Sequence, residues 1–167
     1  MSKMESLEYS ENLINKAKGL VEKAEKELQG YFGSYSNIIL WCQEAIELCG
    51  KAIFKIMNLD FPKEHQLLFS PRKSEVRPVV RELLKKEFPK YFAYREEIPR
   101  VIFLTYFWHN LYTIAKYGLS DVDVSPDKLF SKEDAELALK HAKDCIKVAN
   151  NLLSSKKWRG RKNGNIL

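Results

Sequence analysis

The sequence predicts an all-α fold, an up-and-down bundle of about five helices. Five segments carry apolar residues at intervals of three and four, which is the pattern of amphipathic helices. No segment shows the alternation of apolar and polar residues that a half-buried strand would have. The chain has 167 residues, of which 45% are hydrophobic, and a chain of this size buries about 70% of its unfolded surface. A single domain is therefore expected.

The first helix is predicted from about Leu7 to Leu28, and Gly30 and Gly33 should end it. Its apolar positions are Leu7, Leu13, Ile14, Ala17, Leu20, Val21, Ala24 and Leu28. Charged residues are spread over this whole segment, so it lacks the continuous apolar stretch of a secretory signal peptide. No membrane association is expected, because the most apolar run, from Val101 to Ala115, is too short to span a bilayer.

The second helix should begin near Tyr35 and end before Pro62, and it has the most complete apolar face. That face consists of Ile38, Ile39, Cys42, Ala45, Ile46, Cys49, Ala52, Ile53 and Ile56. The polar residues assigned to the other side are Gln43, Glu44, Glu47, Lys51 and Lys55. Small residues such as Ala45 and Gly50 would let another helix approach closely. We therefore predict that this segment is the central helix of the bundle.

Prolines mark the starts of the next two helices. A short helix is predicted from Pro78 to Phe88, with Pro78 in its first turn. Pro99 should likewise open a helix from about Ile98 to Tyr117, which Gly118 closes. The apolar side chains between Val101 and Trp108 surround more of this helix than one small bundle needs to cover, so a homodimer is predicted.

The last helix is predicted over residues 131–155. Ser131 and Asp134 have the spacing of a capping box. The predicted buried face consists of Ala135, Ala138, Ala142, Ile146, Ala149 and Leu153. Residues 1–155 would thus form the bundle.

Five of the six net positive charges lie in the last twelve residues. These cations are Lys156, Lys157, Arg159, Arg161 and Lys162. Gly160 and Gly164 interrupt the helical pattern, so residues 156–167 are predicted to be a flexible basic tail. Such a tail could follow a phosphate backbone and stack Trp158 on a base. The alternative is a solvated chain end that aids solubility.

Cys42, Cys49 and Cys145 lie in predicted apolar stripes, where a thiol behaves as a small core side chain. Cys42 and Cys49 would be about 10 Å apart along one helix, which excludes a disulfide between them. Free core thiols favour a reduced, cytoplasmic protein. The histidines are scattered and no glycine-rich phosphate loop is present, so no metal and no cofactor are predicted.

Two motifs stand out in the sequence. The first pairs a Q-E-A-x-E helix with a P-K-x-H turn. Its residues here are Tyr35, Gln43, Glu44, Ala45, Glu47, Lys51, Ala52, Pro62, Lys63 and His65. The second is the A-K-Y-G sequence of residues 115–118, followed by a loop and by the F-S-K-E-D-A-E-L-A sequence of residues 130–138. Together these motifs resemble the HEPN family, in its minimal archaeal or bacterial type. The resemblance covers roughly residues 35–155 and implies an all-helical, nucleotide-binding domain.

The resemblance also implies a test for catalysis. Ribonuclease members of the family carry an arginine followed by a histidine four to six residues later on one helix. Here Arg100 and His109 are separated by eight residues, which places them on opposite faces of a helix. The usual ribonuclease centre is therefore not recognisable, and catalysis is not expected.

Several polar residues of the predicted fourth helix share one face. They are Thr105, His109, Tyr112, Thr113 and Lys116, with Tyr106, Asn110 and Tyr117 beside them. His109, Tyr112, Lys116 and Tyr117 are candidates for binding a nucleotide, and His109 and Lys116 would serve any rearranged catalytic site. Alternatively, His109 is a hydrogen-bonded core residue and the tyrosines are packing residues.

The turn after the second helix allows two interpretations. Pro62 could simply end the helix while His65 caps a neighbouring carbonyl. Alternatively, a basic rim around a nucleotide or RNA would be formed by Lys63, His65, Arg72, Lys73 and Arg77.

Taken together, these features predict a non-catalytic nucleotide- or RNA-binding module. The resemblance implies a role in toxin-antitoxin or defence systems beside a nucleotidyltransferase-type partner. The residues predicted to contact nucleic acid also include Lys156, Lys157, Trp158, Arg159 and Arg161. Two other classes stay open: a metal-independent ribonuclease with a rearranged site, and a structural bundle that binds a partner helix.

Overall fold

The computed structural model describes residues 3–30, 33–70 and 75–164, and the side chains of residues 5–30, 33–70 and 75–158. Within these residues every regular element is a helix and no strand is present. Two isolated antiparallel bridges, Phe69 with Val76 and Leu119 with Val124, close small loops. The predicted all-α class is confirmed.

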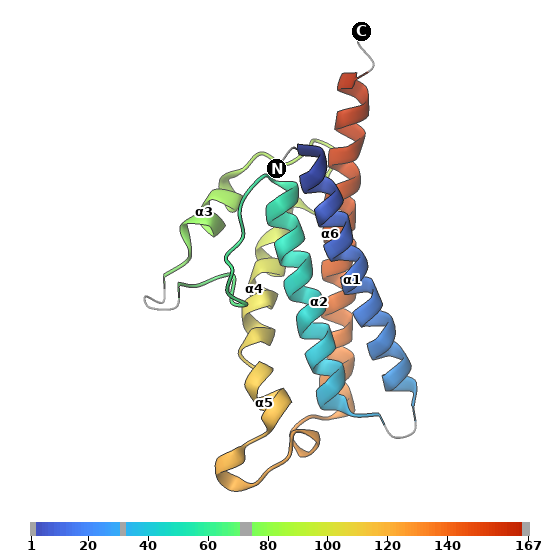
Figure 1. Cartoon of the computed structure of the whole chain (residues 1–167), viewed down its shortest axis with the longest axis vertical. Helices are drawn as coiled ribbons and strands as arrows, with labels where there is room; N and C mark the ends of the chain where they lie inside the picture. The colour runs from blue at the N-terminus through green and yellow to red at the C-terminus, as the bar shows by residue number, and fades with distance from the viewer. Residues whose placement is uncertain (1–2, 31–32, 71–74, 165–167) are drawn as a thin grey trace.

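Four long helices form the predicted up-and-down bundle (Figure 1). These are α1 (Lys3–Gln29), α2 (Tyr35–Ile56), α4 (Ile98–His109) and α6 (Lys132–Gly164). In Figure 1, α1 and α4 run downward while α2 and α6 run upward, and α3 (Pro78–Lys85) lies outside the bundle. The short helix α5 (Tyr112–Tyr117) continues below α4.

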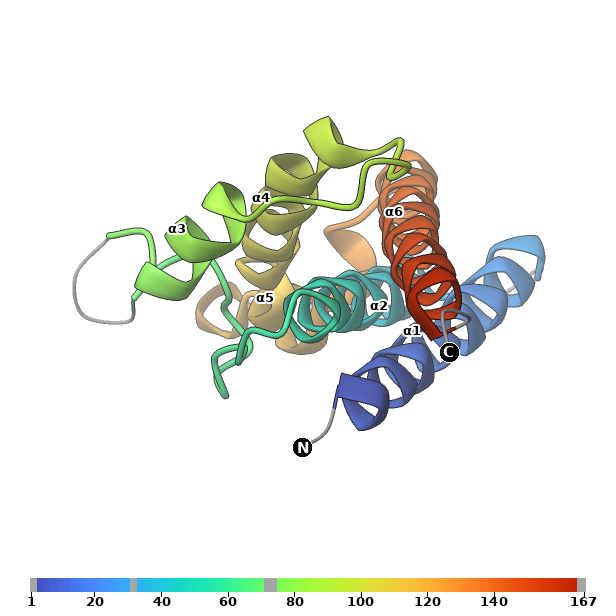
Figure 2. The ribbon, with the colours of Figure 1, turned by 90° about the horizontal axis from the view of Figure 1, so that it is seen from above.

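Helix α2 is the centre of the fold, as its apolar face predicts. It packs against α1, α6, α4 and α5, and the view from above shows it between these neighbours (Figure 2). Gly50 permits the close contact with α4, because an added Cβ would lie 2.8 Å from Thr105 Cγ2 and 2.9 Å from Leu67 Cδ1. The helix begins at the N-cap Ser34, whose hydroxyl accepts a hydrogen bond from the backbone N–H of Asn37.

The polar side of α2 differs from the prediction. Gln43 and Glu47 were assigned to the solvent side, yet both residues are only 6% exposed. The reason is that α2 is covered on several sides, so its polar residues have to find partners inside the protein. The helix ends at Ile56, where Asn58 adopts a left-handed φ of 55°, a conformation that asparagine tolerates well.

The predicted boundaries of α3 and α4 are wrong. Helix α3 ends at Lys85 rather than Phe88, because the chain turns there and lets Phe88 pack against Phe92. The predicted helix from Ile98 to Tyr117 is broken after His109. At the break, the Asn110 side-chain amide donates to the Tyr106 carbonyl at 2.7 Å, and a side chain that competes for a helical carbonyl interrupts the regular pattern.

Helix α6 begins with the predicted capping box. The Ser131 backbone N–H donates to the Asp134 carboxylate at 2.8 Å, and the Asp134 N–H donates to the Ser131 hydroxyl at 3.3 Å. The sequence predicted that this helix ends at Ser155, but it continues to Gly164. The basic residues 156–164 therefore extend α6, since glycine weakens a helix without terminating it.

The three cysteines are free and buried. Burial raises the pKa of Cys42 and of Cys145 to about 12, so these thiols stay protonated and act as core side chains, as predicted. Among the described residues, none of the helices combines the length and the apolar character that crossing a membrane requires.

Candidate functional site

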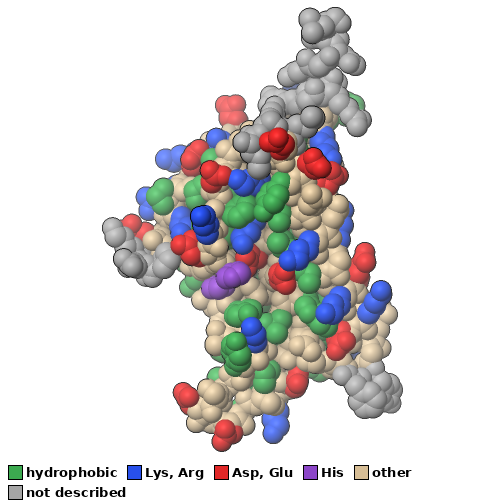
Figure 3. Space-filling view, in the orientation of Figure 1, with side chains coloured by type: hydrophobic (Ala, Val, Ile, Leu, Met, Phe, Trp, Pro, Cys, Tyr) green, Lys and Arg blue, Asp and Glu red, His purple; other side chains and the backbone are tan. Residues whose placement is uncertain are grey.

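A pocket of about 570 Å³ opens beside the middle of α2, and we call it the α2 pocket. Its lining residues are Lys16, Leu40, Trp41, Gln43, Glu44, Glu47, Leu48, Lys51, His65, His109, Tyr112 and Lys116. They come from α1, α2, α4, α5 and the loop that follows α2. A volume of this size is typical of small-molecule sites. Figure 3 shows histidine surface on this face of the molecule, with basic and apolar side chains around it.

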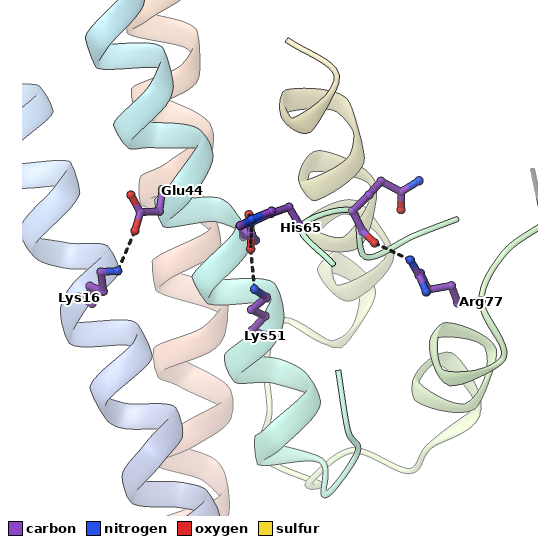
Figure 4. Close-up of polar contacts among 7 residues, drawn as sticks. Lys16, Glu44, Lys51, His65 and Arg77 are labelled. Carbon is purple, nitrogen blue, oxygen red and sulfur yellow. Dashed lines mark hydrogen bonds and ion pairs between the residues drawn. The ribbon is translucent and has the colours of Figure 1, made fainter. Parts of the chain in front are cut away.

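Glu47 is the buried centre of the polar wall of the pocket. Its carboxylate pairs with Lys51 Nζ at 2.6 Å, one helical turn further along α2. It also contacts His65 Nδ1 at 3.0 Å and 3.1 Å through its two oxygens. Figure 4 shows His65 and Lys51 beside each other at α2. The expectation that His65 caps a backbone carbonyl is therefore wrong, because its Nδ1 contacts the Glu47 carboxylate.

The second carboxylate of the pocket, Glu44, is paired as well. Lys16 of α1 lies 2.8 Å from Glu44, and Figure 4 shows this ion pair bridging the two helices. The hydrogen bond and the charge of Glu44 raise the pKa of Lys16. Each of the two carboxylates in the pocket therefore already has a lysine partner.

His109 is partly buried at the end of α4. Its Nδ1 atom is buried without a hydrogen-bond partner among the described residues. Burial lowers the pKa of His109, and the nearby His65 lowers it further, whereas Glu47 acts in the opposite direction. The imidazole is therefore neutral at pH 7, and a neutral imidazole can accept a proton.

Lys116 contributes a positive charge that lies against phenol groups. Its ammonium donates to the Tyr112 hydroxyl at 2.9 Å and lies 5.3 Å from the ring centroids of Tyr112 and Tyr117. The two tyrosines raise the pKa of Lys116. Because tyrosine is neutral at pH 7, these contacts leave the lysine charge uncompensated. The break between α4 and α5 still places Lys116 and His109 at one pocket.

The structure brings together four of the residues singled out from the sequence. His65, His109, Tyr112 and Lys116 line the α2 pocket. Lys63 is exposed on the turn beside it, and Tyr117 contacts Lys116 from the α5 side.

Other predicted site residues are placed elsewhere. Arg77 does not join a basic rim, because its guanidinium donates to the Gln66 carbonyl at 3.2 Å (Figure 4). It also lies 3.4 Å from Glu64. Thr105 is buried and donates to the Ile102 carbonyl, and Tyr106 packs edge-on against Phe69. Arg72 and Lys73 lie outside the described residues.

The sequence did not identify the other half of the pocket. Lys16, Trp41, Glu47 and Lys51 line it, although none of them was a candidate. The sequence did contain one indication of this half of the pocket: Glu47 and Lys51 have the i, i+4 spacing of a helical ion pair. Nothing in the sequence indicated that this pair would be buried against a histidine.

The basic end of α6 lies away from this pocket. Trp158 is 57% exposed, and Lys157 forms a 2.8 Å ion pair with Glu11 of α1. Lys156 belongs to the same helix, as do Arg159 and Arg161, whose side chains are outside the described set. No group of three potential metal ligands is present among the described residues.

Residues 10–157 match the family described as HEPN domain. This match covers most of the chain and includes every residue that lines the α2 pocket. No curated protein and no solved structure matches the chain.

Proposed function

This chain belongs to the HEPN domain family, and we propose that it is a non-catalytic nucleotide-binding module with the α2 pocket as its site. The observation that carries this proposal is the charge pattern of the pocket. Both carboxylates are paired with lysines, whereas Lys116 lies against neutral phenols. The pocket thus presents a net cation to a phosphate, which is a strong hydrogen-bond acceptor for lysine.

The remaining residues fit the other parts of a nucleotide. Tyr112 and Trp41 provide aromatic rings that can stack on a base. His65 and His109 can donate or accept hydrogen bonds at the ribose or the phosphate. The terminal nucleotide of an RNA would present the same groups to the pocket.

Calorimetric titration of the purified chain with mononucleotides and with inorganic phosphate tests this proposal. Lys116→Ala should weaken nucleotide binding about tenfold or more, since a hydrogen bond to a charged group contributes about 1.5–3 kcal/mol. The matched control is Lys85→Ala, which removes an exposed lysine from α3 outside the pocket. Equal affinities in Lys116→Ala and Lys85→Ala would contradict the α2 pocket as the site.

One observation favours a second candidate, a metal-independent ribonuclease. His65 and His109 line the same pocket, and two imidazoles could act as general base and general acid on a ribose 2′-hydroxyl and its phosphodiester. The binding proposal instead expects no efficient RNA cleavage in the absence of metal. Metal-free cleavage that disappears in His109→Ala would establish the second candidate. Cleavage that survives this substitution would indicate a contaminating nuclease.

We further propose a cytoplasmic homodimer that works in a toxin-antitoxin or defence system with a nucleotidyltransferase-type partner. Family membership supports the partner and the system. Two exposed aromatic residues on α4, Phe103 and Phe107, support the dimer, and the free buried cysteines support a reducing compartment. Co-expression of the tagged chain with the product of the neighbouring gene tests the partner, and co-purification is expected.

A further inference from the structure

A second recess, which we call the α6 groove, runs along the C-terminal half of α6. It consists of two hollows of about 520 Å³ and 480 Å³ that share Ser154. The first is lined by Tyr94, Lys147, Asn150, Asn151 and Ser154, and the second by Tyr91, Ser154, Ser155 and Trp158. The α6 residues recur at intervals of three and four and so form one stripe of that helix. Figure 2 shows the chain after α3 crossing to α6, where it supplies the two tyrosines.

The groove presents aromatic rings to solvent. Tyr91 is 72% exposed and Trp158 is 57% exposed, and both line the same hollow. At the other end, Lys147 Nζ lies 5.1 Å from the ring centroid of Tyr94. Aromatic rings at intervals along a groove are platforms on which nucleic-acid bases stack without sequence preference.

Amide groups lie between these rings. Asn150 and Asn151 line the middle of the groove, and Asn151 Oδ1 is buried without a hydrogen-bond partner among the described residues. Asparagine offers both donors and acceptors, which suits the edges of unpaired bases.

The charge of the groove complements a phosphate backbone. None of the residues lining the two hollows is acidic, in contrast to the α2 pocket with Glu44 and Glu47. The last acidic residue of the chain is Asp144, and five lysines and arginines follow Ser155. A strand leaving the groove at Trp158 therefore meets the most basic part of the sequence.

We propose that the α6 groove binds single-stranded nucleic acid, with bases stacked on Tyr91 and Trp158 and phosphates near Lys147 and the basic end of α6. The stripe from Lys147 to Trp158 is about 16 Å long at the rise of a helix, which leaves room for a few successive nucleotides. A duplex fits less well, because its bases are already stacked on each other. This activity is separate from the proposed mononucleotide site in the α2 pocket.

The test is fluorescence anisotropy on the full chain with labelled oligo(U), oligo(dT) and a DNA duplex of equal length. Both single strands should bind more tightly than the duplex. Tyr91→Ala and Trp158→Ala should each weaken single-strand binding about fivefold or more, the lower end of what one stacked base contributes. Trp158→Phe should keep most of the affinity because it keeps a ring. The matched control is Tyr9→Ala, which removes an exposed tyrosine of α1 that lines neither hollow.

The outcomes separate this groove from the α2 pocket. Tyr91→Ala and Trp158→Ala should weaken oligonucleotide binding while leaving mononucleotide binding unchanged, because neither residue lines the α2 pocket. A preference for oligo(U) or for oligo(dT) supports the groove and identifies the kind of strand. The proposal is overturned if the duplex binds as tightly as the single strands, if no oligonucleotide binds, or if Tyr91→Ala and Trp158→Ala match Tyr9→Ala. Circular dichroism of each variant verifies that the helices are intact.

Discussion

At the scale of single residues, the buried ion pair between Glu47 and Lys51 should contribute to the stability of the fold. Its side chain is 8% exposed and that of its partner Lys51 is 14% exposed. Replacing Glu47 by Ala leaves the Lys51 ammonium largely buried without its carboxylate. Removal of one partner of a buried ion pair costs about 3–5 kcal/mol, and we expect the lower end of this range because Lys51 retains some access to water.

Urea denaturation measures this change in the free energy of unfolding. The double variant Glu47→Ala with Lys51→Met should recover part of the loss, because it removes the unpaired charge as well. A single variant as stable as the wild type would show that the pair is hydrated and contributes little.

His141 makes the stability of the bundle depend on pH. Trp108 Nε1–H donates to His141 Nδ1 at 3.2 Å, so the folded protein requires an unprotonated Nδ1. Burial is the main cause that lowers the pKa of His141, and Arg100 and Lys140 lower it further while Asp144 opposes them. The unfolded chain binds the proton with a pKa of about 6.5. Stability is therefore fully present above about pH 6.5 and is lost as the pH falls toward the lowered folded pKa.

We expect the free energy of unfolding to decrease between pH 7.5 and pH 5.5, conditions under which few carboxylates titrate. His141→Gln should make this decrease shallower, since its amide oxygen can accept from Trp108 without binding a proton. Part of the slope should remain, because burial lowers the pKa of His109 as well. Identical slopes in wild type and variant would rule out His141 as a source of the pH dependence.

At the scale of helices, the contact between α2 and α4 depends on Gly50. An alanine there would favour the helix by about 1 kcal/mol. Its Cβ would, however, lie within 3 Å of Thr105 and Leu67, which are both buried, and overpacking a core costs about 1–3 kcal/mol. Gly50→Ala should therefore lower the melting temperature.

Gly19 provides the matched control for this prediction. It lies inside α1, and an added Cβ would meet nothing within 4 Å. Gly19→Ala should therefore raise the free energy of unfolding by up to about 1 kcal/mol, because alanine favours the helix and nothing is overpacked. An increase in stability in both variants would show that α2 and α4 separate easily.

Helix α4 also carries the surface predicted to form a dimer. Phe103 is 51% exposed and Phe107 is 41% exposed, and their rings stack at 6.2 Å. Aspartate at position 103 would place a charge in this interface, so Phe103→Asp should convert a dimer into a monomer in light scattering. The control is Leu137→Asp, which introduces the same charge at an exposed apolar residue of α6 and should leave the dimer intact. A wild-type monomer at micromolar concentration would contradict this interface.

At the scale of the whole molecule, the sequence predicted the bundle better than its site. Helix positions follow from apolar periodicity, and the ends at Ser34, Gly118 and Ser131 follow from local capping chemistry. The break at Asn110 was missed because it depends on a side-chain bond to the Tyr106 carbonyl.

The pocket could be predicted only in part, because it is a property of tertiary packing. Three separate segments, the loop after α2, α4 and α5, bring His65, His109 and Lys116 to the same place. The periodic pattern of α2 assigned Glu47 to solvent, and only the arrangement of the neighbouring helices buries it. Residue types thus identified candidate chemistry, whereas the pairing of Glu47 with His65 required the fold.

Charge is distributed unevenly over the molecule, and this has a measurable consequence. Five of the six net positive charges follow Ser155, leaving a net charge of +1 on residues 1–155. If these cations contact phosphates, removing residues 156–167 should weaken nucleic-acid binding similarly for all sequences. Each neutralised phosphate contributes about −0.9 on duplex DNA or −0.7 on single strands to the slope of log affinity against log salt. Losing three to five contacts should therefore change the slope by roughly 2 to 4.

A second variant separates this charge effect from stacking on Trp158. It keeps the tryptophan and replaces the five cations by glutamine: Lys156, Lys157, Arg159, Arg161 and Lys162. Loss of the exposed ion pair between Lys157 and Glu11 should cost little stability. The glutamine variant should lose most of the salt dependence, because Lys147 remains. It should keep the difference in affinity that Trp158→Ala makes, because stacking requires no charge. The truncated protein and the glutamine variant are titrated at several salt concentrations. If both give the wild-type slope, the five cations are solvated surface and do not contact phosphates. Phosphate binding would then rest on Lys63, Arg72, His109 and Lys116.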